Sequence, residues 1–268
     1  MPMGVRVTMT TILIAFALPS LVRSGSSSSL PHITDAKFIE DCVKSHNLNR
    51  SNVNPTAGDM RYMTWDAALA ITARAWARKC VFKHNIYLNG KEKKVHPTFE
   101  SLGENIWSGY PADSFSVGQA MQSWVDGELP AYVYDQNHCR RICGHYTQVV
   151  WATSYKVGCA VHRCPDGVDE LSLTKGHDTA HFVCNYYPPG NYPTKPYKQG
   201  RACSGCGGEE CERSLCRYGY WSPEWDPEKS RCGAFCQAVL VLRPLAALLT
   251  LASAYFIKRQ CPNIFVYE

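Results

Sequence analysis

Four residues of this chain have side chains that could do chemistry: His84, Glu104, Glu128 and His145. Two neutral imidazoles and a carboxylate are workable ligands for Zn²⁺, with a fourth position open to water. A zinc ion held in this way would lower the pKa of its bound water and permit hydrolysis. In the alternative interpretation, the carboxylates hold the imidazoles by hydrogen bonds and no metal is involved.

No activated nucleophile accompanies these residues. Neither Ser101 nor Ser108 has a general base at a sequence separation that would indicate a catalytic pair. Nothing in the sequence points to a Ser-His-Glu arrangement. The cysteines are expected to be oxidised, because the N-terminal segment and the cysteine content indicate a protein of the secretory pathway. The sequence therefore favours binding over turnover.

The N-terminus and the 14 cysteines together indicate an oxidising compartment. Arg6 precedes an apolar stretch over 9–21, and Val22 and Ser24 suit the −3 and −1 positions of a signal peptidase site. We therefore expect a signal peptide over 1–24. The alternative is a buried N-terminal helix, but no residue caps it and a Gly-Ser run ends it.

A second apolar segment, 234–257, is long enough for one membrane span. Arg243 and Pro244 interrupt it, and Lys258 begins a short polar tail, 258–268, with a cytoplasmic positive flank. These features predict a single-pass type I membrane protein. A lipid-anchor signal is disfavoured by the polar ending, and a buried C-terminal helix of a soluble protein is the other alternative.

Between these segments, the apolar periodicity predicts helices followed by interleaved strands. Expected N-caps are Thr34 for the first helix, Thr64 or Asp66 for the second, and Ser114 or Ser116 for the third. The predicted helices cover 38–46, 65–80, 117–125 and a short turn at 146–151, and the predicted strands cover 104–107, 157–162 and 180–186. This order indicates an α+β fold with an antiparallel sheet.

After the last strand the composition changes. A proline-rich arm over 188–196 is interpreted as an extended linker, and a cluster of four cysteines over 203–216 follows. The cluster resembles a zinc ribbon superficially, but its spacing leaves too little chain between the pairs, so disulfides are favoured. The predicted organisation is a signal peptide (1–24), a linker (25–34), a globular domain (35–195), a cysteine-rich hinge (196–216), a stalk (217–233), a membrane helix (234–257) and a cytoplasmic tail (258–268).

The charges exclude one class of partner. The formal net charge is +5, and Lys and Arg are spread along the chain without a basic stripe, so nucleic acid is not an expected partner.

Asn49-Arg50-Ser51 is a formal N-glycosylation sequon, although packing near the end of the first helix could occlude it. Cys236 and Cys261 flank the membrane segment and are candidates for palmitoylation.

Two stretches resemble the CAP superfamily of cysteine-rich secretory, antigen 5 and pathogenesis-related proteins. They are GHYTQVVW at 144–151 and HFVCNYYPPGN at 181–191, supported by GENIW at 103–107. The resemblance covers about 35–216. With the C-terminal segment added, the chain is most similar to the membrane-anchored glioma pathogenesis-related branch.

The resemblance implies an α/β/α sandwich with a small disulfide-rich extension. It also implies that Cys143 is bonded, and that one of Cys42 and Cys139 is free or paired with Cys232. The implied disulfides are Cys80–Cys164, Cys159–Cys184, Cys203–Cys211 and Cys206–Cys216.

The resemblance further implies that two His and two Glu converge in a central cleft. His84, Glu104 and His145 lie at matching positions, but the family's fourth residue falls on Gly127, and Glu128 is one residue later. One residue changes direction by about 100° on a helix. Glu128 therefore reaches the cleft only if the helix has ended or contains an inserted residue.

The function that follows is an extracellular, membrane-anchored recognition protein. It would bind a protein, sterol or lipid ligand, with a His/Glu cleft suited to zinc. The alternative is a metal-dependent extracellular hydrolase, specifically a peptidase.

Overall fold

Four strands form the central sheet, in the order β1–β5–β6–β2. They are β1 (Thr64–Trp65), β5 (Lys156–Cys164), β6 (Thr179–Tyr187) and β2 (Gly103–Gly109). β6 is antiparallel to both β5 and β2, whereas the short edge strand β1 is parallel to β5. The computed structural model that shows this arrangement describes residues 30–89, 95–217 and 234–260.

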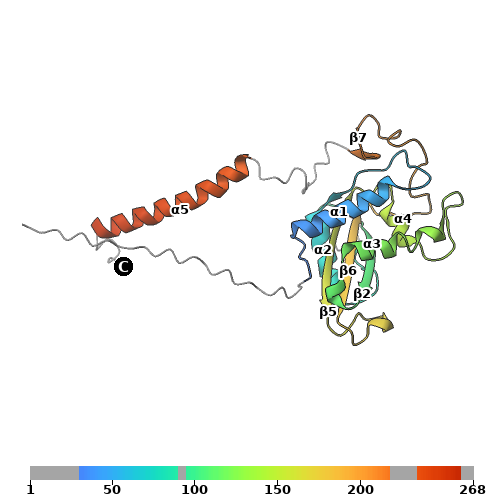
Figure 1. Cartoon of the computed structure of the whole chain (residues 1–268), viewed down its shortest axis with the longest axis horizontal. Coiled ribbons are helices and arrows are strands. Elements are labelled where there is room, and N and C mark those ends of the chain that lie inside the picture. Colours follow the sequence, from blue (N-terminus) through green and yellow to red (C-terminus); the bar gives the residue numbers. More distant parts are fainter. Residues whose placement is uncertain (1–29, 90–94, 218–233, 261–268) are drawn as a thin grey trace, which may run out of the picture.

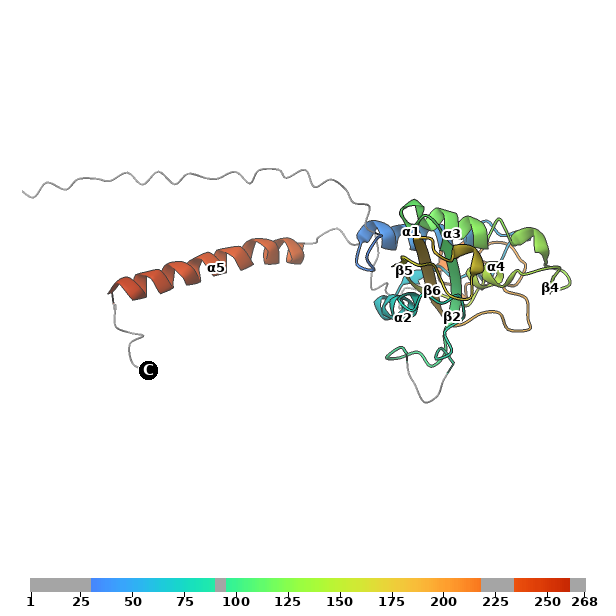
Figure 2. The same cartoon turned by 90° about the horizontal axis from the view of Figure 1, so that it is seen from below.

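Helices cover both faces of the sheet. α1 (Ala36–Ser51) and α3 (Val117–Trp124) lie on one face and α2 (Ala67–Ala77) on the other, as Figures 1 and 2 show. α4 (Gly144–Val149) lies beside β2 and α1. The three layers confirm the expected α/β/α sandwich.

The helix ends follow local side-chain chemistry. Asp66 caps α2 by accepting the Leu69 N–H, and Ser116 caps α3 in a capping box with Gln119. The first helix is capped by Asp35, not by the expected Thr34. Trp65, predicted as the first residue of the second helix, forms β1 with Thr64 instead, because both pair with β5 far along the chain.

Aromatic rings join the sheet to the helices above it. Phe38 of α1 contacts Trp65 and Phe182 edge-on, with ring centroids 6.2 Å apart in each case. Trp124 of α3 stacks on the same Phe182 at 5.4 Å. The core therefore fixes where α3 ends relative to the sheet.

Short elements complete the body: the hairpin β3 (Tyr132–Val133) and β4 (His138–Cys139), the hairpin β7 (Glu210–Glu212) and β8 (Leu215–Arg217), and the 3₁₀ turns Ala112–Ser114, Leu129–Ala131 and Ser172–Thr174.

The cysteine-rich hinge is hydrogen-bonded to the segment 57–62. The Gly58 N–H donates to the Lys198 carbonyl (2.9 Å) and the Tyr62 N–H to the Cys216 carbonyl (2.9 Å). The arm predicted as a linker also packs on the globular body, since the Ala152 N–H donates to the Pro196 carbonyl at 2.7 Å.

All four implied disulfides are present, together with Cys139–Cys143. Cys42 is free, and it is buried. The expectation that Cys143 is bonded and that one of Cys42 and Cys139 is free is confirmed. Cys232 and Cys261, like the signal peptide, lie outside the described residues.

Residues Ala234–Gln260 form helix α5, which contains Arg243 and Pro244. The predicted helix is present, but the predicted membrane span over 234–257 is not supported. Within the ranges that the structure describes, no helix combines the length and apolarity that crossing a membrane requires. A charge such as that of Arg243 costs a few kcal/mol inside a bilayer. α5 lies apart from the sheet in Figures 1 and 2 and is not buried against it.

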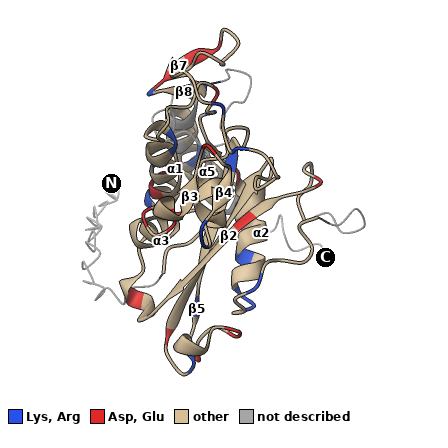
Figure 3. Cartoon of the chain, turned by 90° about the vertical axis from the view of Figure 1, so that its right-hand side faces the viewer, with Lys and Arg blue, Asp and Glu red and all other residues tan. Residues whose placement is uncertain are grey.

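Charged residues are distributed over many elements. Figure 3 shows Lys and Arg scattered over helices, strands and loops, and β7 in the colour of acidic residues. The described part of the chain has no continuous basic stripe in this view.

Candidate functional site

Glu128 and His145 form the first of two His–Glu pairs. Nδ1 of His145 donates to Oε1 of Glu128 at 2.5 Å. The other carboxylate oxygen, Oε2, accepts the backbone N–H groups of His145 (2.9 Å) and Tyr146 (3.0 Å), which open α4. The carboxylate therefore binds the start of this helix and the imidazole at once.

The end of α3 explains how Glu128 reaches this position. The helix ends at Trp124, and the Gly127 N–H donates to the Gln122 carbonyl, five residues back (3.0 Å). This wider turn adds a residue relative to a regular helix. A Cβ at Gly127 would come to 2.5 Å from the Ser123 carbonyl oxygen, so the turn requires glycine. The wide turn therefore explains how Glu128, one residue after the position that the resemblance implies, reaches His145.

His84 and Glu104 form the second pair. Nδ1 of His84 donates to Oε1 of Glu104 at 3.0 Å, and the Asn85 N–H donates to the same oxygen at 2.8 Å. The side-chain amide of Asn185, on the neighbouring β6, donates to Oε2 at 3.3 Å. The hydrogen bond to Glu104 raises the pKa of His84, although partial burial opposes the shift. The Glu104 side chain is 2% exposed, whereas that of His84 is 68% exposed.

Strand β2 links the two pairs. Asn105, next to Glu104, donates its side-chain amide to the His145 carbonyl at 3.0 Å. On the other side, the Trp124 ring stacks nearly parallel to the His145 imidazole, with centroids 6.0 Å apart. The position of His145 is therefore set by α3, α4 and β2 together.

Residues 43–186 match the model of the cysteine-rich secretory protein family, CAP. The chain belongs to the CAP family. It is 41% identical over 256 residues to glioma pathogenesis-related protein 1 of Mus musculus, covering 91% of this chain and 93% of that relative. It is 47% identical over 194 residues to GLIPR1-like protein 1 of Homo sapiens, covering 72% of this chain and 76% of that relative. These matches confirm the resemblance found in the sequence.

A solved CAP-family structure is similar in fold. The crystal structure of NaASP2 with Zn²⁺ superposes with a TM-score of 0.53 at 27% identity, covering 70% of this chain and 96% of NaASP2. In the CAP chain described here, however, no three His, Cys, Asp or Glu side chains of the described residues gather closely enough to hold a metal ion. The four predicted site residues come together as two hydrogen-bonded pairs, and a three-ligand zinc set is not formed. Zinc is therefore not established for this chain.

The CAP chain contains one serine–histidine contact that the sequence did not reveal. Ser108 Oγ and His181 Nδ1 are hydrogen-bonded at 2.7 Å, a contact that no spacing in the sequence indicated. The two residues lie 73 positions apart and meet only because β2 and β6 pair in register. Burial lowers the pKa of His181 to about 4. A general base works best with a pKa near the operating pH, and no carboxylate of the described residues hydrogen-bonds to this ring, so the contact is not a catalytic triad.

The predicted glycosylation acceptor, Asn49, lies in the last turns of α1. Its side-chain amide donates to the Ser45 carbonyl at 2.9 Å, and the following Arg50 is fully buried. The sequon is therefore part of a packed helix end.

Proposed function

We propose that this extracellular CAP-family protein acts by recognition, and that the two His–Glu pairs shape a surface for a protein, sterol or lipid ligand. The observation that carries the proposal is that the carboxylates of Glu104 and Glu128 are both occupied by hydrogen bonds within the protein. Each oxygen of Glu104 and Glu128 accepts at least one hydrogen bond from a backbone N–H, an amide or an imidazole. A carboxylate committed in this way positions its histidine and is poorly placed to accept a substrate proton.

The alternative, a metal-dependent peptidase, needs a group of at least three metal ligands, and none is found among the described residues. Catalytic zinc sites use three protein ligands and an open position. Here each of His84 and His145 keeps only Nε2 free of hydrogen bonds to other described residues, so each has one nitrogen to offer a metal ion. A metal-bound histidine normally donates its other ring N–H to a carboxylate or carbonyl, which is the arrangement of both pairs. This chemistry is compatible with zinc capture and supplies no third ligand for hydrolysis.

Calorimetric zinc titration of the purified full chain, together with a screen of peptide and ester substrates with and without chelator, tests the proposal. The expected result is no chelator-sensitive turnover, with any zinc affinity lost in His145→Ala. Glu128→Gln is the matched variant, since it keeps the shape of the side chain but removes its charge. Chelator-sensitive turnover that His145→Ala abolishes would overturn the recognition function in favour of the peptidase.

A further inference from the structure

A concave surface lies where the proline-rich arm and the residues that follow it, up to 199, cross the body. One hollow of about 610 Å³ is lined by Asp59, Tyr134, Trp151 and the arm residues 194–199. A second hollow of about 280 Å³ shares Trp151, Thr194 and Pro196 with the first and extends to Cys139. The two hollows therefore adjoin, and we call them together the arm groove. None of the four residues of the His–Glu pairs lines it.

The arm groove is held in shape by hydrogen bonds between segments far apart in sequence. Tyr134 OH donates to the Tyr197 carbonyl at 2.8 Å, and the two rings stack with centroids 4.9 Å apart. The Ala152 N–H donates to the Pro196 carbonyl at 2.7 Å, and the Lys198 N–H to Asp59 Oδ1 at 3.0 Å. A surface fixed in this way loses little conformational entropy when a ligand binds.

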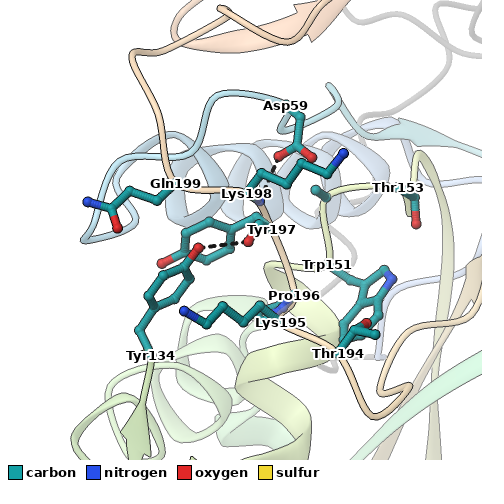
Figure 4. A pocket seen from close by; sticks show the side chains of 11 residues that line it. Asp59, Tyr134, Trp151, Thr153, Thr194, Lys195, Pro196, Tyr197, Lys198 and Gln199 are labelled. Carbon is teal, nitrogen blue, oxygen red and sulfur yellow. Dashed lines mark hydrogen bonds between the residues drawn. The ribbon is translucent and has the colours of Figure 1, made fainter. Parts of the chain in front are cut away.

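The first hollow combines aromatic rings with ammonium groups. Figure 4 shows Lys195 extending from the arm toward Tyr134, and its Nζ lies 4.4 Å from the centroid of that ring. Lys195 and Lys198 are both exposed, and the single carboxylate of the lining, Asp59, accepts a backbone N–H of the arm. The charge of this hollow therefore favours an anionic ligand.

The far end of the groove is closed by a short disulfide loop. Cys139 lines the second hollow and is bonded to Cys143, which closes the loop 139–143. Arg140 and Arg141 of this loop are exposed but line neither hollow, and the Arg141 side chain donates to the Gly127 carbonyl at 3.4 Å. The positive charge of the groove lining is therefore that of Lys195 and Lys198.

From these observations we infer that the arm groove binds an extended, acidic, proline-containing polypeptide segment. Proline-rich chains in the polyproline II conformation bind grooves lined by aromatic side chains, because their extended shape is preformed. Acidic residues in such a segment would lie against Lys195 and Lys198. The rings open to a proline are those of Tyr134 and Tyr132, which are half-buried, and of Tyr192, which is 55% exposed, whereas Trp151 and Tyr197 are buried.

The test measures fluorescence anisotropy of a labelled peptide of repeating Glu-Pro-Pro with the full chain. We expect saturable binding, no binding of a Lys-Pro-Pro repeat, and a loss of affinity of about tenfold or more, equivalent to about 1.4 kcal/mol, in Lys195→Glu. Lys175→Glu is the matched control, because Lys175 is an exposed lysine of the loop before β6 and does not line the groove. Thermal unfolding of both variants checks that the fold is retained, and Lys198→Glu replaces Lys195→Glu if it is not.

Three outcomes overturn the inference. The Glu-Pro-Pro peptide does not bind, or it binds equally to Lys195→Glu and Lys175→Glu, or a sulfated oligosaccharide binds at the groove lysines while the peptide does not. None of these outcomes bears on the His–Glu pairs, so the proposed function at the cleft is tested separately.

Discussion

Gly127 lies so close to Ser123 that an added Cβ would come to 2.5 Å from the Ser123 carbonyl oxygen. This close approach forms the wide turn after α3, and the turn places Glu128 against His145. The family pattern has its acidic residue at the position of Gly127, so the glycine and the displaced glutamate act together. One residue without a side chain allows the next residue, Glu128, to reach His145.

Gly127→Ala is therefore expected to displace Glu128 and to destabilise the protein by about 1–3 kcal/mol, because backbone must move to remove the clash. Chemical denaturation measures the free energy of unfolding. Gly118→Ala, inside α3, is the control: its Cβ would meet only Ser116 Oγ at 3.9 Å. Alanine there should leave stability unchanged or raise it by up to about 1 kcal/mol. Equal effects of the two substitutions would contradict the role assigned to the turn.

Replacing Glu104 should change the titration of His84. The hydrogen bond from Glu104 raises the pKa of His84 in the folded protein. The stability from this pair is fully present below the unfolded pKa of about 6.5 and is lost as the pH rises through the raised folded pKa. In Glu104→Gln, NMR titration should find the His84 pKa lower than in the parent chain. An unchanged His84 pKa would show that the pair does not form in solution.

Two buried histidines should make the protein acid-sensitive. Burial lowers the pKa of both His46 and His181 to about 4. The unfolded chain binds these protons near pH 6.5, so stability falls as the pH drops from about 6.5 toward 4, by about 3 kcal/mol for each histidine. Denaturant unfolding at a series of pH values measures this slope. His46→Gln should reduce it, and a pH-independent stability between 6.5 and 4 would contradict the burial of both rings.

Arg50 should be among the most sensitive positions of the fold. Its buried guanidinium donates to five carbonyl oxygens, those of Arg61, Val149, Trp151, Ala152 and Ser154. Lysine cannot reproduce this planar set of donors. Arg50→Lys is expected to cost about 3 kcal/mol or more, measured by the midpoint of denaturant unfolding. The exposed Arg140→Lys serves as the control and should stay within about 0.5 kcal/mol of the parent chain.

Several features of this chain follow from local sequence. Asp66 and Ser116 cap helices because their side-chain oxygens meet nearby backbone N–H groups. The strands around 104, 157 and 180 are recognisable because side-chain direction alternates along a strand. The CAP motifs, matched residue by residue, predicted the disulfides and three of the four cleft residues.

Other features depend on contacts between distant segments, which only the tertiary structure decided. Residues 64–65 became a strand because β5 offered an unpaired edge, and Ser108 met His181 because two strands paired in one register. Glu128 reached His145 because a wide turn ended α3, and the arm groove arose where Asp59, Tyr134 and Lys195 came together. Local propensity describes a residue and its near neighbours, whereas these contacts are set by how the whole chain packs, and no short stretch of sequence carries that information.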